Sequence, residues 1–129
     1  MPDHSVALTR ISSYDEPALG RAVAGQFDLL GGLDRFAKKG DTVLLKPNLI
    51  APRSHRHATQ THPAVIIAVA RMLKDLGAKP FVGDSPAWSN AQTCVRVLRL
   101  DGPLKELGVP VVELNKPRWR RLGANGTKV

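Results

Sequence analysis

The sequence predicts an α/β fold: a mostly parallel sheet of about four strands with helices on its faces. Short apolar runs alternate with segments of helical periodicity along most of the 129 residues. The segment from Leu44 to Pro86 has the pattern strand–helix–strand. Such a crossover within one sheet is almost always right-handed and makes its two strands parallel. Apolar residues make up 43% of the chain, which is enough for a modest core in a single domain.

The amino-terminal third is expected to contain two strands and the helix between them. Residues 5–11 alternate well enough to predict the first strand. In the helix that follows, Asp15 is the expected cap, and Tyr14 and Leu19 have the spacing of a hydrophobic staple. Residues 42–45 are an apolar run that predicts the second strand, and a proline two residues later ends it.

A helix capped by Thr61 is expected to connect the second strand to the third. Pro63 lies in its first turn, a common position for proline, and Gly77 ends it where a left-handed residue is needed. Residues 80–82 predict the third strand. The expected buried stripe of this helix, which follows the helical period, consists of Val65, Val69, Met72, Leu73 and Leu76.

The last predicted elements follow residue 88. Ser89 and Gln92 have the spacing of a capping box and predict a helix. Residues 103–107 predict a short helical piece, and residues 110–114 predict the fourth strand. The alternation of strands and helices therefore continues up to Leu114.

Beyond Leu114 no hydrophobic period continues. We assign residues 1–114 to the α/β domain and residues 115–129 to a basic tail that we expect to be disordered. A sheet that ends on its fourth strand is expected to be an incomplete part of a larger α/β domain. Its last strand would leave an unpaired edge, through which we expect self-association.

The net charge of +8 is concentrated in the tail. All 11 acidic residues and fourteen of the 19 basic ones precede Asn115, whereas the tail holds five basic residues and no acidic one. Such a tail can contact nucleic acid through phosphates, but Trp119 is its single aromatic residue and no nucleic-acid-binding fold accompanies it. The sequence therefore favours a tail that is exposed to solvent over a tail that binds nucleic acid.

The remaining composition excludes several classes of protein. A single cysteine, Cys94, forms neither a disulfide framework nor a thiolate metal cluster within the chain, and its apolar helical face predicts a core position. The first residues lack the apolar stretch of a signal peptide, and no run reaches membrane-spanning length. We therefore expect a cytoplasmic location and no membrane contact. No glycine-rich phosphate-binding motif occurs, which argues against a standard dinucleotide or triphosphate site.

Polar residues follow the second and third predicted strands and open the helix between them. Because the carboxyl ends of parallel strands meet at one edge, where open α/β sheets bind ligands, we expect these residues to share a patch roughly 15 Å across. A concavity lined by Pro47, Pro86 and Trp88 is expected beside them. The residues are Lys46, Asn48, His62, Asp84 and Ser85.

Three of these residues are predicted to be catalytic, although each also has a structural interpretation. Lys46 can hold an anion as a point charge, or its stem can lie on the sheet with its head in water. His62 can act as a general acid or base, or it can be a neighbour of the helix cap. Asp84 can bind a metal or orient a cationic group, or it can cap the turn that follows it.

The loop between the second strand and the central helix carries basic side chains near the same edge. A helix start attracts anions through its free amide groups, so we predict a site for an anionic small molecule, a phosphate or a carboxylate. Histidines 55, 57 and 62 suit a metal, but no carboxylate or thiolate lies at ligand spacing, and no metal ligand is predicted. The predicted ligand-binding residues are Asn48, Arg53, Arg56, Thr61 and Ser85.

Three motifs in order resemble the family catalogued as domain of unknown function 362. They are Val-Leu-Leu-Lys-Pro-Asn-Leu at residues 43–49, Thr-His-Pro at 61–63 and Val-Gly-Asp-Ser-Pro at 82–86, and the resemblance covers the chain to about Leu114. Many members resemble iron–sulfur proteins in which a ferredoxin-type domain with clustered cysteines follows the α/β part. The resemblance implies that this chain is the amino-terminal portion, that it holds no cofactor itself, and that any iron–sulfur cluster belongs to a downstream domain.

Two classes of function follow from the sequence. The first is a domain that binds an anionic small ligand at the carboxyl edge of its sheet, as part of an iron–sulfur-linked redox enzyme if the resemblance extends to activity. The alternative is a non-enzymatic binding module that contacts nucleic acid through its basic tail. The sequence leaves open whether the chain is an enzyme.

Overall fold

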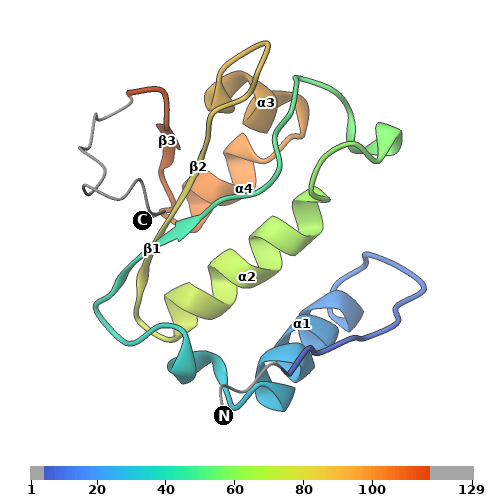
Figure 1. The fold of residues 1–129 in the computed structure, drawn as a ribbon, viewed down its shortest axis with the longest axis vertical. Coiled ribbons are helices and arrows are strands. Elements are labelled where there is room, and N and C mark those ends of the chain that lie inside the picture. Colours follow the sequence, from blue (N-terminus) through green and yellow to red (C-terminus); the bar gives the residue numbers. More distant parts are fainter. Residues whose placement is uncertain (1–4, 117–129) are drawn as a thin grey trace, which may run out of the picture.

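The computed structural model describes residues 5–116 and shows a small parallel sheet with helices (Figure 1). The strands lie in the order β1-β2-β3, and both neighbouring pairs are parallel. The predicted α/β class is confirmed, with three strands rather than four. The strands are β1 (Thr42–Leu45), β2 (Lys79–Asp84) and β3 (Val111–Glu113).

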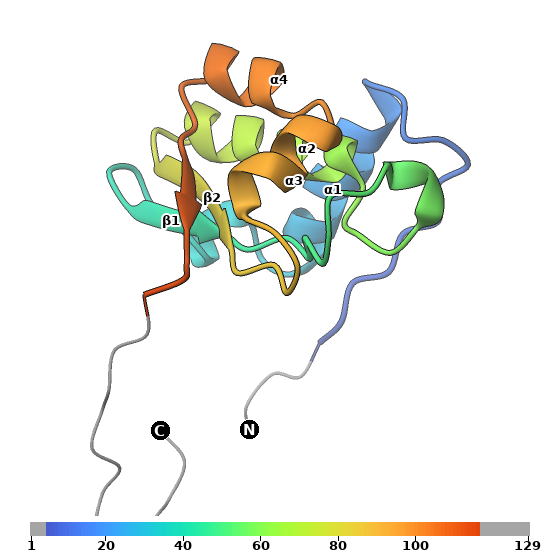
Figure 2. The same ribbon diagram turned by 90° about the horizontal axis from the view of Figure 1, so that it is seen from above.

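The helices lie on one side of the sheet (Figure 2). The opposite face carries Leu44, Phe81 and Val112, and Leu44 and Val112 are each 40% exposed. Right-handed crossovers that run from β1 to β2 to β3 place their helices on the same face, which explains this one-sided arrangement. The helices are α1 (Ala18–Leu29), α2 (Pro63–Asp75), α3 (Ala91–Val97) and α4 (Asp101–Glu106), with short 3₁₀ helices η1 (Leu33–Arg35) and η2 (His55–His57).

The predicted first strand, residues 5–11, is wrong, since this segment forms no strand. Its apolar side chains remain in solvent: Val6 is 80% exposed and Leu8 is 87% exposed. Alternation stabilises a strand only where one face of the strand can be buried against a core. No described strand pairs with this segment, so its pattern has nothing to pack against.

Helix α2 is the centre of the packing, but its buried residues are mostly not those of the predicted stripe: Leu73 is buried, whereas the other four predicted residues are half-buried. It lies between the sheet and α1 (Figure 1). Ile66 and Ala70 belong to the main core with β2, α3 and α4, while Ala68 packs against Leu19 and Val23 of α1. A helix buried on two sides does not have the one narrow apolar stripe of an amphipathic surface helix.

The side chain at the N-cap position caps two of the α-helices, in each case one residue after the predicted position. The cap of α2 is His62 and not Thr61, and His62 Nδ1 accepts a hydrogen bond from the Ala64 N–H at 3.2 Å. The cap of α3 is Asn90 and not Ser89. Pro63 occupies the first turn of α2 as predicted.

Two further contacts connect parts of the chain that are distant in sequence. Tyr14 stacks on the ring of His62, the cap residue of α2, at 3.7 Å between ring centroids, and the staple predicted between Tyr14 and Leu19 stays a prediction. The position before α1 is Pro17, which has no side-chain cap bond, and Asp15 is therefore not the cap. At the other end, the Glu113 carboxylate accepts hydrogen bonds from the first two N–H groups of α3.

The predicted disordered tail, residues 115–129, falls outside the described residues from position 117 onward. Nucleic-acid contact through that tail, and self-association through an open sheet edge, stay predictions. No helix within residues 5–116 is both long and apolar enough to cross a membrane. The cytoplasmic location also stays a prediction.

Candidate functional site

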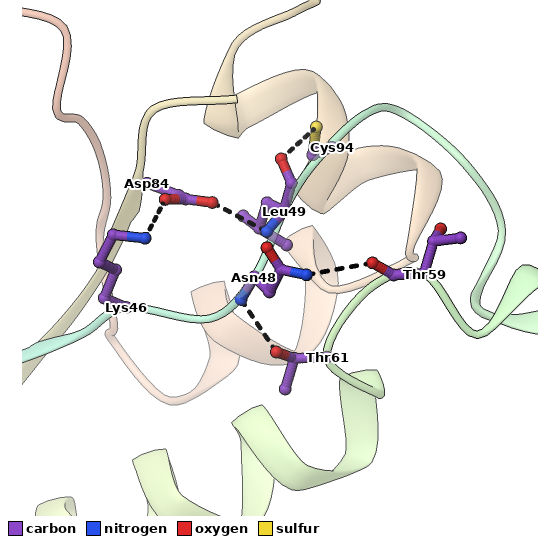
Figure 3. A network of polar contacts seen from close by, with 7 residues as sticks. All are labelled: Lys46, Asn48, Leu49, Thr59, Thr61, Asp84 and Cys94. Carbon is purple, nitrogen blue, oxygen red and sulfur yellow. Dashed lines mark hydrogen bonds and ion pairs between the residues drawn. The ribbon is translucent and has the colours of Figure 1, made fainter. Parts of the chain in front are cut away.

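The parallel pairing of β1 and β2 brings the residues after the two strands together. Leu45 lies opposite Val82, so Lys46 and Asp84 emerge at the same edge of the sheet. Lys46 Nζ lies 2.6 Å from Asp84 Oδ1 (Figure 3). This placement is the one expected from the crossover, although the catalytic roles assigned to the two residues stay predictions.

Asp84 is almost completely buried and both of its oxygens have partners. The residue is 5% exposed, whereas the Lys46 side chain is 59% exposed. Asp84 Oδ2 accepts a hydrogen bond from the Leu49 N–H at 2.8 Å. Burial by itself raises the pKa of Asp84, but hydrogen bonds from Lys46 and from the N–H groups of Leu49 and Ser85 outweigh it, and the net pKa is lowered. Asp84 therefore acts as an ionised anchor for the chain that leaves β1.

The predicted ligand residues Asn48 and Thr61 bind each other. The Asn48 N–H donates to Thr61 Oγ1 at 2.9 Å, and the Thr61 N–H donates to the Asn48 carbonyl at 3.1 Å. Asn48 Nδ2 donates to the Thr59 carbonyl, which closes the loop between β1 and α2 (Figure 3). We call this set the edge network; its members are Lys46, Asn48, Leu49, Thr59, Thr61, Asp84 and Cys94.

Cys94 is a core residue, as predicted. It is fully buried, and its thiol donates a weak hydrogen bond to the Leu49 carbonyl at 3.8 Å. Burial, followed by the charges of Asp84 and Glu113, raises the pKa of this thiol, so the thiolate that reacts or binds metals is disfavoured. The residues of this chain do not fit an iron–sulfur cluster, because Cys94 is its single cysteine and lies in the core.

The edge network leaves little room for a ligand. The hollow beside it has a volume of about 150 Å³ and includes Lys46, Pro47 and Thr61 in its lining. The predicted lining residues Pro86 and Trp88 do not border it, and Trp88 and Ser85 are exposed. The polar groups of Asp84, Asn48 and Thr61 are thus engaged in internal contacts, while the Lys46 side chain remains 59% exposed.

The start of α2 does not offer the free amide groups that were expected for an anion. Pro63 has no N–H, the Ala64 N–H is bound by His62 Nδ1, and the Val65 N–H donates to the His62 carbonyl. His62 also contacts the His55 ring edge-to-face at 5.1 Å. Burial, and then the charge of His55, lowers the pKa of His62, which favours the neutral ring that can accept the cap hydrogen bond.

A second depression, much larger than the first, lies between η2, the start of α2 and the turn that connects α3 to α4. Its volume is about 820 Å³. Its charged lining is basic: no acidic residue of the described chain lines it. We call it the basic hollow; it is lined by Ser54, His55, Arg56, His57, Pro63, Ala64, Ile67, Val97, Leu98, Arg99, Leu100 and Pro103.

The two arginines of the basic hollow, Arg56 and Arg99, form no ion pair with any acidic residue between positions 5 and 116. Arg56 was a predicted ligand-binding residue and lines the hollow, whereas Arg53 is exposed and does not line it. A cationic pair without a carboxylate partner keeps its full capacity to bind an external anion.

Two residues next to or in the lining of this hollow have a strained backbone conformation. In the described chain, the two non-glycine residues with a positive φ are Ala58 (φ 51°) and Arg99 (φ 57°). Ala58 follows η2, and Arg99 follows the end of α3, where the Leu100 N–H donates to the Val95 carbonyl at 2.9 Å. Glycine is the usual residue at such a helix end, because other residues are strained there.

Sequence reasoning missed Arg99. The available signal was a helix that ends in Leu98-Arg99-Leu100 without a glycine, although a left-handed residue is common at that point. Nothing in the sequence places this turn beside the loop that holds Arg56, more than forty positions earlier. A metal site finds no support in residues 5–116, where no group of three or more potential ligands comes together.

The sequence is similar to one protein family and to one curated protein. The family model of the domain of unknown function DUF362 matches residues 43–128, which includes the edge network, the basic hollow and most of the basic segment at the end. The thylakoid-associated protein sll1697 of Synechocystis sp. is 37% identical over 115 residues, which cover 89% of this chain and 36% of that protein. The chain thus spans little more than a third of the length of the curated relative that it matches. No solved structure matches the chain.

Proposed function

This chain belongs to the DUF362 family, a domain of unknown function, and we propose that it binds an anionic small molecule in the basic hollow. The observation that carries the proposal is the pair Arg56 and Arg99, which face a hollow of about 820 Å³ and have no acidic partner in the described chain. A phosphate or a carboxylate is the chemical group that such a pair recognises.

The site differs from the one expected at the sheet edge. At that edge, the lysine and aspartate neutralise each other and the loop amides are already bound. In the hollow, each guanidinium group can donate two parallel hydrogen bonds to an anion. His55 and His57 of η2 add further ring N–H donors to the same lining.

The edge network has a supporting role in this proposal. Asp84 holds the Leu49 N–H, and the Asn48–Thr61 bonds close the loop that carries η2. A loop that is held at both ends positions Arg56 with little loss of entropy when a ligand binds. Lys46 and Asp84 are then positioning residues for the loop.

The activity of the longer protein is a separate proposal that depends on other segments. The resemblance to iron–sulfur-linked redox proteins suggests that an anionic substrate bound here is delivered to a cluster held elsewhere. Residues 5–116 bring together no ligand set for that cluster, and the sequence holds a single cysteine. The alternative remains a binding module without catalysis, and a nucleic-acid partner would be recognised by a steep loss of affinity with salt.

The test is a titration of the 129-residue chain with orthophosphate and, separately, with malonate. Binding is followed through the ring resonances of His55 and His57. We expect saturable shifts in the millimolar range and about tenfold weaker binding in Arg99→Gln. Arg96→Gln is the matched control, because Arg96 is an exposed arginine of α3 that does not line the hollow. The absence of any saturable shift at about 10 mM ligand in the unaltered chain would contradict the proposal.

A further inference from the structure

We propose that the ligand of the basic hollow is an organic anion with an apolar body, such as an aryl phosphate or an aryl carboxylate. This inference rests on the proposed function and narrows the class of ligand. An inorganic anion would satisfy the basic side chains but would leave most of the hollow empty. Three features of the hollow favour such a ligand: its lining, its volume and the backbone position of Arg99.

The lining has an apolar part in addition to the basic one. Ile67 of α2, Val97 at the end of α3 and Pro103 of α4 border the same hollow as the arginines. Val97 is 42% exposed, although it lies next to a buried core. Apolar surface that is left in water beside a cationic group gains free energy when an apolar ligand covers it.

The volume fits an organic molecule. Small-molecule sites usually measure roughly 300–1,000 Å³ and combine apolar walls with a few polar groups that fix the orientation of the ligand. The hollow, at about 820 Å³, lies within this range. A single phosphate would occupy a small part of it and would reach only the basic side.

Arg99 is fixed where the two kinds of lining meet. Its neighbours Leu98 and Leu100 are buried in the main core, and Arg99 itself is exposed in a left-handed conformation. Burial of both neighbours holds the arginine backbone in place before any ligand arrives. Such preorganisation favours a ligand that presents its charge and its apolar body in one orientation.

The experiment compares phenyl phosphate, orthophosphate and phenol as ligands of the 129-residue chain, with dissociation constants measured by calorimetry or by NMR titration. We expect phenyl phosphate to bind at least about tenfold more tightly than orthophosphate, and phenol to bind more weakly than phenyl phosphate by a similar factor.

A variant of the apolar lining identifies where the phenyl ring binds. Val97→Thr is expected to weaken phenyl phosphate about threefold and to leave orthophosphate unchanged. Val112→Thr is the matched control, because Val112 is a valine of similar exposure on the open face of the sheet. Equal affinities for orthophosphate and phenyl phosphate would overturn this inference and leave the proposed function standing. Failure of both anions to bind would overturn the proposed function itself, and a preference unchanged by Val97→Thr would overturn the assigned lining.

Discussion

The edge network and the basic hollow differ in whether their polar groups have partners within the described chain. In the edge network, the Asp84 carboxylate binds Lys46 and the Leu49 N–H, and the Asn48 backbone binds Thr61 in both directions. In the basic hollow, two arginines lie beside a depression without an acidic partner in the described chain. The first region uses its polar groups for folding, and the second leaves them available to solvent or to a ligand.

The two regions also differ in backbone conformation. Both non-glycine residues with a positive φ in the described chain, Ala58 and Arg99, lie at the ends of segments that line the hollow. Strain of this kind persists where the surrounding structure enforces it, and it is common at functional sites. Strand-end motifs can thus mark a structural anchor, while the surface that we propose for anion binding lies beside η2 and the α3–α4 turn.

The largest expected effect comes from breaking the edge network. Asp84→Asn removes the charge that holds Lys46 and weakens the bond to the Leu49 N–H, so we expect the free energy of unfolding to fall by about 2 kcal/mol. Because the pKa of Asp84 is lowered in the folded chain, this stabilisation is present at neutral pH and is lost as the pH falls below about 3.9 through the lowered pKa. Urea unfolding at pH 7 and at pH 3 measures both effects.

The control for this variant is Asp28→Asn on α1, where the aspartate is exposed and a change within about 0.5 kcal/mol is expected. Anion affinity of the folded Asp84→Asn chain should fall by no more than about threefold, because one anchor of the loop that carries Arg56 is lost while the Asn48–Thr61 hydrogen bonds remain. If Asp84→Asn abolished anion binding without a change in stability, the edge network would be the ligand site and the division between the two regions would be wrong.

A smaller effect is expected at His62, which belongs to the cap of α2. Its pKa is lowered in the folded chain, so the unfolded chain binds more protons as the pH falls below about 6.5, and the folded state loses stability there. The loss should approach the contribution of one helix cap, about 1 kcal/mol. Asn is a good cap at any pH, so His62→Asn should reduce the difference in stability between pH 7.5 and pH 5.5. His57→Asn, which leaves the cap intact, should retain it.

The strand–helix–strand unit β1–α2–β2 was predictable because its signals lie close together in the sequence. A proline after β1, a proline in the first turn of α2 and a glycine at its end mark the strand–helix–strand unit, and handedness then places Lys46 beside Asp84. The false first strand at residues 5–11 shows the limit of this reasoning. Alternation describes a side-chain pattern and does not show whether a partner strand exists.

The basic hollow was only partly predictable, for a physical reason. Arg56 follows β1 by eleven positions, and its loop could be identified as basic from the sequence alone. Arg99 reaches the same hollow because α3 packs through Cys94 and Val95 into the core beneath that loop. This long-range packing has no signature in composition or spacing. The expectation of free amide groups at the start of α2 has a local cause instead: the cap was placed at Thr61, whereas His62 caps the helix and accepts the hydrogen bond of the Ala64 N–H.

The smallest expected effect on stability comes from two substitutions that separate charge from strain at the basic hollow. A left-handed residue other than glycine costs about 1 kcal/mol, part of which is offset by the greater flexibility of glycine in the unfolded chain. Arg99→Gly and Ala58→Gly are therefore both expected to raise the free energy of unfolding by about 0.5 kcal/mol. Arg99→Gly should nevertheless weaken phosphate binding about tenfold, whereas Ala58→Gly, which removes no charge, should leave it nearly unchanged. Urea unfolding and a phosphate titration of the two variants provide the measurement.

A large loss of stability in Arg99→Gly would mean that this arginine holds the α3–α4 turn together. Retention of full affinity would mean that Arg99 is not the residue that binds the anion.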